Sequence, residues 1–485
     1  MNMKNRRKFL KNSALLGTGF FIVPRNVLGG PGFISPSDQL NIAAIGAGGK
    51  GYDITNKWAS GERVIALCDV HPDKNDVLNA RKKYPNANVY VDFREMLDNE
   101  KDLDAVTVST PDHTHGIIAS NAMNRGLHAY VQKPLTHNIE EARKLTQIAK
   151  KNKVVTQMGN QGGSSTGVVK IQEWVDKKMI GKIHKIYAWT NRPVWPQGFP
   201  MEDRSEDKPA NLNWDLWLGP ASYTKYTSQL HPFNWRGWWD YGTGALGDMG
   251  CHILDAPYKT LGLHYPTDVE CSVGSVFQQA WSQNFIPEGC PPSSIVTLHF
   301  DKTKKNDSKI ELVWMDGGLR PNHPEDIPAD DYLGEINSTN GVLMIGEKGV
   351  ISCGVYALEP KLYRKGKETI TFKTESKLLD HDHHMEWING IKGGYGSDAY
   401  KKITAPFEYA GPFTEAVLMG NLAIRSYMSM GKEKPKYSPD RYHTSEYGKF
   451  VGRKKLLWDG ENMRITNFDE ANQFVGRTRR SGWEF

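Results

Sequence analysis

Short runs of aliphatic and β-branched residues recur along the chain from residue 39 to residue 158. These apolar runs lie at 39–45, 63–68, 88–91, 105–109, 128–131 and 154–158. Segments with helical periodicity separate several of them, for example at 117–124 and 139–150. Buried strands that alternate with helices predict a parallel, doubly wound sheet. We therefore expect a Rossmann domain over residues 38–160 in a protein of the α/β class.

The pattern of apolar positions changes beyond residue 160, where a second domain is predicted over residues 161–485. Strand-like segments lie at 185–189, 294–300, 309–314 and 341–346. Because strands and helices are mixed there, we expect a second domain of the α/β class. We also expect its last helices to pack back on the first domain.

The first 37 residues have the pattern of an export signal and linker. Arg6 and Arg7 precede a short apolar run at 14–23, and a stretch rich in Gly, Pro and Ser follows. This run is too short for a membrane span, and the pattern is typical of export signals. The arginine pair resembles the twin-arginine signal. We expect a periplasmic protein without membrane attachment after signal removal; a cytosolic chain with a basic start is the alternative.

Composition narrows the range of partners. Hydrophobic residues make up 39% of the chain and charged residues 24%, as in ordinary globular proteins. Part of the net charge of +6 lies in the first eleven residues, and no basic stripe with interleaved aromatic residues follows. Nucleic acid is therefore not expected as a partner. The five cysteines lack Cys-x-x-Cys spacing, which argues against a disulfide framework and a cysteine-based metal site.

A glycine-rich turn follows the first predicted strand. Gly46, Gly48 and Gly51 form the pattern G-x-G-x-x-G, and Gly49 lies between the last two. Such glycines allow a tight turn and a close approach to a pyrophosphate, which the N-terminus of the following helix stabilises. Asp69 ends the second strand, where a carboxylate binds ribose hydroxyls and repels a 2′-phosphate. The sequence thus predicts NAD as the cofactor, in preference to NADP.

Three further motifs occur in order along the chain. Residues 110–115 are Thr-Pro-Asp-His-Thr-His, residues 132–134 are Gln-Lys-Pro, and residues 244–255 have the pattern G-x-x-x-D-x-G-x-H-x-x-D. With these motifs the chain resembles, from residue 39 onward, the glucose–fructose oxidoreductase / inositol dehydrogenase / MocA family. Gln132 departs from the Glu-Lys-Pro form that is usual for the second motif.

The resemblance implies that the second domain, residues 161–485, supplies substrate-binding, catalytic and oligomerisation residues. It also implies that this domain is built on a large, mostly antiparallel sheet, whose open face pairs subunits into a homo-oligomer, a dimer or tetramer. It also implies that Lys133, Asp248 and His252 are catalytic. The residues expected to line the dinucleotide, besides the glycines and Asp69, are Thr110, Pro111, His115, Gln132 and Lys133.

The residue types of the third motif suit the oxidation of an alcohol. Asp248 and His252 are four residues apart, so a helix places them on one face. Histidine can accept the hydroxyl proton, and Lys133 can stabilise negative charge on the reacting oxygen. The alternative for Asp248 and His252 is a structural cap or core pair. Asp255, one turn further, is a candidate substrate contact, with exposure to solvent as the alternative.

Aromatic residues indicate a carbohydrate substrate. Half of the 14 tryptophans lie between residues 189 and 239, interleaved with charged and amide side chains. Sugar rings have apolar C–H faces that stack on flat aromatic rings, whose face is electron-rich. We expect at least half of these tryptophans in the core, and Trp235 and Arg236 in contact with substrate.

The run His381-Asp382-His383-His384 contains metal-ligand residue types. Zinc ligands are normally separated along the chain, and adjacent residues rarely point at one ion. We therefore expect no metal there, and instead a loop that caps a helix beginning at Met385.

The predicted compartment constrains the function. An exported enzyme lacks free NAD, so we expect a tightly bound cofactor that is regenerated on the protein. The first hypothesis is an oxidoreductase that moves hydride between NAD and a sugar or glycoside hydroxyl. The second, implied by the resemblance, is an NAD-dependent glycosidase that oxidises, eliminates and re-reduces. The third is a non-catalytic carbohydrate-binding protein.

Overall fold

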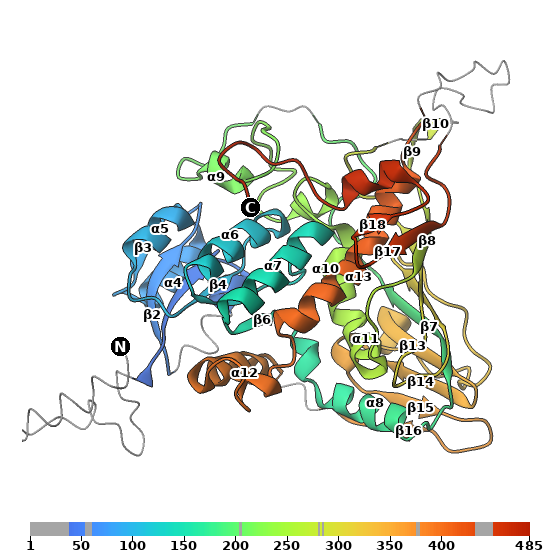
Figure 1. The fold of residues 1–485 in the computed structure, drawn as a ribbon. Coiled ribbons are helices and arrows are strands. Elements are labelled where there is room, and N and C mark those ends of the chain that lie inside the picture. The colour runs from blue at the N-terminus through green and yellow to red at the C-terminus, as the bar shows by residue number, and fades with distance from the viewer. Residues whose placement is uncertain are drawn as a thin grey trace, which may run out of the picture.

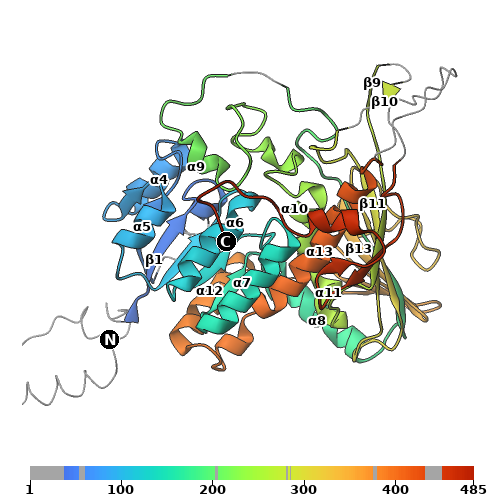
Figure 2. The same ribbon diagram turned by 45° about the horizontal axis from the view of Figure 1, so that its top comes forward.

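The computed structural model describes residues 38–53, 61–202, 206–279, 282–283, 286–374, 379–431 and 450–485. The predicted export signal, residues 1–37, lies outside them. Two sheets stand on opposite sides of a central group of helices (Figure 1 and Figure 2). No helix in the described part of the chain combines the length and the apolarity that crossing a bilayer requires.

The N-terminal sheet is parallel and has six strands in the order β3-β2-β1-β4-β5-β6. Its strands are β1 (Asn41–Ile45), β2 (Arg63–Cys68), β3 (Asn88–Tyr90), β4 (Ala105–Val108), β5 (His128–Val131) and β6 (Thr156–Met158). The connecting helices are α4 (Asn75–Lys83), α5 (Phe93–Asn99), α6 (Asp112–Asn124) and α7 (Ile139–Asn152). The strand order reverses between β1 and β4, and such a switch point is where doubly wound sheets bind ligands. The predicted doubly wound fold is confirmed.

The second sheet has ten strands in the order β16-β15-β14-β13-β7-β12-β11-β8-β17-β18. They are β7 (Ile183–Thr190), β8 (Asp268–Val273), β11 (Ser294–Phe300), β12 (Ile310–Met315), β13 (Asn340–Gly346), β14 (Gly349–Cys353), β15 (Lys361–Tyr363), β16 (Ile370–Thr371), β17 (Leu456–Asp459) and β18 (Arg464–Ile465). Strands β7 and β12 pair in parallel, and the other neighbours are antiparallel. The expected mostly antiparallel sheet is therefore confirmed. A separate two-stranded ribbon consists of β9 (Phe277–Gln279) and β10 (Ser282–Gln283).

Helices cover the inner face of the second sheet. They are α8 (Thr166–Asp176), α10 (Gly244–Ile253), α11 (Asp255–Leu261) and α13 (Phe407–Tyr427). α13 is buried along most of its length and contacts α7, α10 and β8 (Figure 2). Arg143 on α7 and Glu415 on α13 form an ion pair whose nitrogen and oxygen atoms are 2.7 Å apart. α13 therefore joins both domains into one core.

Helix α12 (Leu379–Gly393) returns the chain to the Rossmann domain and covers the sheet face opposite to α6 and α7 (Figure 1). The side chains that meet there are Ile42, Ala105, Tyr130 and Val155 of the sheet and Trp387, Ile388 and Ile391 of the helix. Burying a large apolar side chain of this kind contributes roughly 1.5–3 kcal/mol. This helix from the second predicted domain therefore completes the core of the first.

The helix expected to begin at Met385 begins earlier, at Leu379, so the predicted capping loop is wrong. His383 and His384 are buried inside α12 instead. The His383 Nδ1 lies 2.8 Å from the Ser164 hydroxyl, and its Nε2 lies 2.9 Å from the Met158 carbonyl oxygen. Among the described residues, no group of three or more His, Cys, Asp or Glu side chains could hold a metal ion.

The outer face of the second sheet is covered in part by the connection between β12 and β13. Ile327 and Leu333 of this connection pack on Trp189 of β7. Toward β8 the same face carries the Lys185–Glu311 ion pair at 2.8 Å and a hydrogen bond between His299 Nδ1 and Asp268 Oδ1 at 2.6 Å. Pairing of subunits through this sheet stays a prediction, restricted to the part that the connection leaves open.

The imidazole of His113 joins α6 to the tryptophan-rich segment that precedes α10. Its Nε2 lies 2.8 Å from the Trp217 carbonyl oxygen, and its Nδ1 lies 3.2 Å from that of Tyr241. Burial, with a smaller effect of Arg477, lowers the His113 pKa to about 3. The ring is therefore neutral in the folded protein at ordinary pH.

We predict that acidification from pH 6.5 toward pH 3 destabilises the protein, because the unfolded chain binds a proton at His113 that the folded chain does not. The free energy of unfolding should fall by up to about 1.4 kcal/mol per pH unit for one such histidine. Urea unfolding at several pH values measures this slope. The slope should be shallower in the His113→Gln variant, and an equal slope in both proteins would contradict the prediction.

Candidate active site

A cavity of ≈ 610 Å³ lies along the carboxyl ends of the Rossmann strands, between this sheet and α10. Its walls include the loops after β1 to β5, together with α9 (Trp214–Leu218) and the short helices η3 (Asn234–Gly237) and η5 (Val355–Ala357). The loops after β3 and β5 are four strand spacings apart, roughly 19 Å. This main cavity is therefore elongated, which suits a dinucleotide better than a compact ligand.

The glycine loop forms the wall of the main cavity next to β1. Gly46 has a φ of +77°, and a Cβ there would collide with the backbone of Ser109. A Cβ on Gly51 would collide with the carbonyl oxygen of Gly46, so this position keeps the helix close to the strand. Gly48 and Gly49 line the cavity, where their backbone can approach a ligand.

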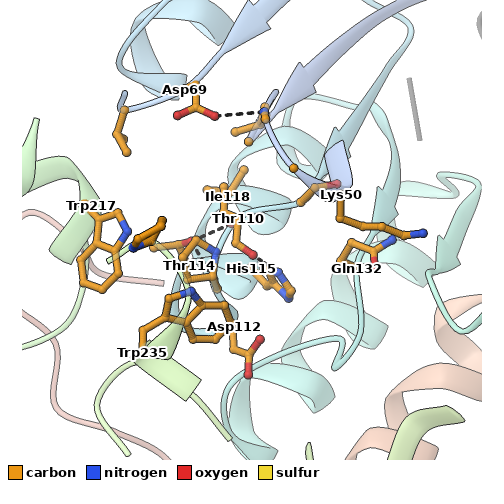
Figure 3. Close-up of a pocket in the computed structure, with 18 of the residues that line it drawn as sticks. Lys50, Asp69, Thr110, Asp112, Thr114, His115, Ile118, Gln132, Trp217 and Trp235 are labelled. Carbon is orange, nitrogen blue, oxygen red and sulfur yellow. Dashed lines mark hydrogen bonds between the residues drawn. The ribbon is translucent and has the colours of Figure 1, made fainter. Parts of the chain in front are cut away.

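Asp69 follows β2 and lines the same cavity (Figure 3). Its Oδ2 accepts a hydrogen bond from the Gly48 N–H at 3.2 Å, and its Oδ1 accepts one from the His71 N–H at 3.0 Å. Burial raises the Asp69 pKa, and the two backbone donors oppose this rise. The carboxyl group is thus fixed beside the glycine loop, where it can accept hydrogen bonds from ribose hydroxyls.

Thr110 and Pro111 line the main cavity in the loop after β4. His115 follows on α6 with a fully buried ring. Its Nε2 lies 2.8 Å from the Thr110 carbonyl oxygen, and its Nδ1 lies 2.8 Å from that of Pro134. His115, expected to contact the cofactor, therefore also braces the loop after β4 against the loop after β5.

Gln132 follows β5 and is buried at the wall of the cavity (Figure 3). Its Nε2 has no hydrogen-bond partner among the described residues. An unsatisfied buried donor is costly, and an oxygen atom of a ligand in the cavity would remove this cost. The amide of Gln132, the Asp69 carboxyl group and the glycine loop together fit a dinucleotide such as NAD.

Lys133 and Asp248 bring the two domains together at the far end of the main cavity. The Lys133 Nζ donates to Asp248 Oδ1 at 2.7 Å and to the Asp248 carbonyl oxygen at 2.8 Å. Arg236 Nε lies 3.4 Å from the same Oδ1. Burial alone would raise the Asp248 pKa, but the charges of Lys133 and Arg236 lower it to about 2. Asp248 is therefore a carboxylate that holds two cations at the cavity.

His252 lies one helical turn after Asp248, and its buried imidazole lines the cavity. The Tyr356 ring meets it edge-on, with ring centroids 4.8 Å apart. Tyr356 belongs to η5 and has a left-handed φ of 60°, which is uncommon for a residue with a bulky side chain. Lys133, Asp248 and His252, expected from the sequence to act together, thus lie at one end of one cavity.

Trp235 and Arg236 also line this end of the cavity, as a substrate-contacting pair requires. The Arg236 guanidinium lies over the Trp235 ring, 4.2 Å from its centroid, and 4.6 Å from that of Phe233. Its Nη1 donates to the Phe233 carbonyl oxygen at 3.0 Å. Stacking and hydrogen bonding hold Arg236 in place while it remains partly exposed to the cavity.

Asp255, proposed from the sequence as a substrate contact, does not line the main cavity. α10 ends at Ile253 and α11 begins at Asp255, so the continuous helical phase assumed for the motif is interrupted. The Asp255 carboxyl group is buried instead, where it accepts a hydrogen bond from the Tyr409 hydroxyl and lies 3.6 Å from Lys259 Nζ. It stabilises the packing of α11 on α13.

The tryptophans between residues 189 and 239 are all buried, in agreement with the expectation that at least half of them belong to the core. All of them are at most 6% exposed, and only Trp217 and Trp235 among them line the main cavity. Trp214 stacks on Trp217 with centroids 4.5 Å apart, and both belong to an apolar cluster with Trp235 and Trp238. The predicted carbohydrate wall is thus mainly a structural layer, because most of these rings contact one another instead of the cavity.

Aromatic residues that the sequence patterns missed also line the cavity, among them Tyr356 and Trp483. Neither belongs to a motif, and each reaches the site from a segment distant in sequence. Unusual backbone geometry at Tyr356 is visible only in three dimensions. For Trp483, the sequence signal that could have indicated a functional segment is the cluster of Arg477, Arg479 and Arg480 shortly before it.

The fold and this cavity are those of a two-domain, dinucleotide-binding protein with a cluster of charged side chains at one end of the cavity. A model of an oxidoreductase family with an NAD-binding Rossmann fold matches residues 40–160, and a model of the C-terminal α/β domain of the same family matches residues 165–282. The chain belongs to the glucose–fructose oxidoreductase / inositol dehydrogenase / MocA family of oxidoreductases.

Two curated relatives illustrate the range of named activities. Levoglucosan dehydrogenase from Pseudarthrobacter phenanthrenivorans is 22% identical over 232 residues, which cover 46% of this chain and 52% of that protein. An α-N-acetylgalactosaminidase from Shewanella oneidensis is 29% identical over 175 residues, 31% of this chain and 38% of that protein. The chain thus matches about half or less of the length of these relatives.

Solved structures share the whole architecture at low sequence identity. The WlbA dehydrogenase from Bordetella pertussis, in complex with NADH and UDP-GlcNAcA, has a TM-score of 0.54 and 12% identity, covering 80% of this chain and 97% of that one. The aldose–aldose oxidoreductase from Caulobacter crescentus, complexed with glycerol, has a TM-score of 0.54 and 15% identity, covering 80% and 98%. These likenesses establish the two-domain fold.

Proposed function

We propose that the protein is an NAD-dependent oxidoreductase that transfers hydride between a tightly held nicotinamide cofactor and a hydroxyl group of a sugar or glycoside. The observation that carries this proposal is the cluster of Lys133, Asp248 and His252 at one end of a cavity whose other end has the dinucleotide features. The stacked Trp235 and Arg236 beside the cluster support a carbohydrate substrate, since an aromatic face suits C–H groups and a guanidinium suits hydroxyls.

The residues at the reaction centre have separable tasks. Bound NAD supplies the acceptor or donor of hydride. Asp248 remains ionised and holds the Lys133 ammonium in place, so that Lys133 Nζ can donate to the reacting oxygen and stabilise its negative charge. The His252 imidazole accepts the proton of the substrate hydroxyl during oxidation and returns it during reduction.

Asp69 supports NAD over NADP. Its carboxyl group stands beside the glycine loop and would repel a 2′-phosphate while it accepts hydrogen bonds from an unmodified ribose. The twin-arginine pattern supports periplasmic localisation, where free NAD is not supplied. Retention of the cofactor, with oxidation and reduction on the same protein, would allow repeated turnover there. Assembly into a homo-oligomer through the second sheet is part of the same proposal.

An NAD-dependent glycosidase is the second candidate, favoured by curated relatives named as family 109 glycosyl hydrolases and by the relative named α-N-acetylgalactosaminidase. Ordinary glycosidases use two carboxyl groups that flank the bond. In this cavity Asp248 is committed to Lys133, and Asp112 is buried with its Oδ2 accepting from Thr243. Cleavage here would therefore require transient oxidation, elimination of the substituent and re-reduction. Release of the substituent without net NADH would identify this route.

We predict that the purified protein contains stoichiometric NAD. Denaturation followed by mass spectrometry of the released nucleotide tests this. A protein that is empty but binds added NAD would contradict retention and indicate an ordinary dehydrogenase with an exchangeable cofactor. A protein that neither contains NAD after purification nor binds added NAD would contradict the proposed function. This result would favour the non-catalytic carbohydrate-binding hypothesis.

The Asp69→Ala variant should bind NAD at least about tenfold more weakly, because hydrogen bonds to a charged group are lost. The preference for NAD over NADP should shrink at the same time, since the repulsive charge is gone. Equilibrium titration with both nucleotides measures the two effects. Asp98→Ala, which removes an exposed carboxylate of α5, is the matched control. Equal affinity of Asp69→Ala and the parent protein would contradict the ribose contact.

The His252→Ala variant should lose about 100-fold or more in kcat, because a general base is removed. Its NAD content should match that of the parent protein. Nicotinamide absorbance after addition of sugars and glycosides measures turnover, and His184→Ala, at an exposed position of β7, is the control. A parallel loss of NAD would show that His252 holds the cofactor instead of moving the proton.

A further inference from the structure

Residues 477–485 cross from the second domain to the Rossmann domain and lie beside α6, α7 and α9 (Figure 1 and Figure 2). No motif of the family resemblance covers this segment. It nevertheless contributes a side chain to the main cavity, because Trp483 is one of the lining residues. The segment thus forms part of the wall of the predicted dinucleotide site.

Arg480 fastens the segment to the tryptophan-rich region around α9. Its Nη1 lies 2.6 Å from Asp215 Oδ1, and its Nη2 donates to the Asp215 carbonyl oxygen at 2.9 Å. Its Nε donates to the Gly219 carbonyl oxygen at 2.9 Å. The backbone N–H of Arg480 donates to the Pro220 carbonyl oxygen at 3.2 Å. Such a network fixes the guanidinium and the backbone together.

Arg479 fastens the same segment to the Rossmann domain. Its Nη2 lies 2.9 Å from Glu141 Oε1 on α7, and the Glu141 side chain is nearly inaccessible. The Phe485 ring packs so closely on α6 that a Cβ on Gly116 would approach its Cε2 to 2.9 Å. The segment is therefore anchored both on α7 and on α9, and α9 supplies Leu216 and Trp217 to the cavity wall.

Trp483 lies in the sequence between Arg480, which contacts the α9 region, and Phe485, which packs on α6, and it is 6% exposed. Its ring centroid is 6.2 Å from that of Phe93, and the Arg94 guanidinium lies 4.6 Å from the Trp483 centroid. Phe93 begins α5, directly after β3, and also lines the cavity. In the sheet order, β3 neighbours β2, which ends before Asp69. Trp483 therefore belongs to the end of the cavity beyond Asp69, away from Lys133.

The chemistry of that end suits a purine base. In a Rossmann site the glycine loop binds the pyrophosphate, and the acid after the second strand binds the adenosine ribose. The base attached to this ribose therefore lies beyond Asp69. The side chains there include Phe93, Trp483 and Ile118, which offer flat and apolar surfaces. Bases stack on aromatic side chains irrespective of hydrogen-bond readout.

We propose that Trp483 is an adenine-binding residue and that residues 477–485 form a clamp that retains the dinucleotide on the protein. This inference rests on the proposed NAD-dependent function. The clamp gives a structural basis for tight binding, because the nucleotide leaves only after Trp483 moves. The Arg480–Asp215 pair is partly exposed, so salt screens it and opens the clamp more often.

The experiment measures the rate at which bound NAD exchanges for labelled NAD in the full-length protein. Trp483→Ala should accelerate exchange about tenfold or more, as expected for loss of one base–aromatic stack. Trp483→Phe, which keeps an aromatic ring, should restore most of the retention. Trp458→Phe, at a buried tryptophan of β17 that does not line the cavity, should exchange at the parent rate. Exchange in the parent protein should also become faster as the salt concentration rises.

The outcomes separate the clamp from the function on which it rests. Parent-like exchange in Trp483→Ala, with NAD bound, overturns the clamp and leaves the proposed function intact. Absence of NAD binding in the parent protein overturns both. If Trp483→Ala fails to fold, the Arg480→Ala variant is used instead. This variant keeps the Trp483 indole but loses the contacts of Arg480 with Asp215 and Gly219. Faster exchange in that variant supports the clamp, and an unchanged rate overturns it.

Discussion

The pairing of Lys133 with Asp248 is the interaction on which the geometry of the cavity depends. A buried ammonium or carboxylate is costly alone, and each is tolerated here because the other is within hydrogen-bond distance. The pair links the loop after β5 in the Rossmann domain to α10 in the second domain. Neither element can shift without leaving a charge unpaired. The dinucleotide wall and the substrate wall are therefore held at a fixed separation, and Arg236 extends this constraint to Trp235.

The layer of buried tryptophans also helps to hold the two walls of the cavity in place. Trp214 and Trp217 stack on each other, and the carbonyl oxygen of Trp217 contacts His113 on α6. The layer thus fastens α9 and η3 to the Rossmann domain. Large aromatic side chains bury much area with few rotatable bonds, so such a layer is stiff. What seemed from composition to be a surface for sugar is mostly the support that positions Trp235 and Arg236.

Features that depend on local geometry were predictable from the sequence. The glycine loop and Asp69 follow from a motif between a strand and a helix, Asp248 follows from the family resemblance, and the structure brings all of them to one cavity. Asp255 was misplaced because α10 ends before it, and a short break between helices changes the direction of the next side chain. Tyr356 and Trp483 reach the cavity through contacts between distant segments, which no local pattern encodes.

Helix α12 has a consequence for the modularity of this protein. The Rossmann sheet is formed by residues that end at Met158, yet one of its faces is completed by a helix that begins at Leu379. A fragment cut at residue 160 would expose Ile42, Tyr130 and their neighbours as an apolar patch prone to aggregation. The nucleotide-binding half is thus not a transferable unit. Recombining it with another substrate domain would require the new partner to bring an equivalent of α12.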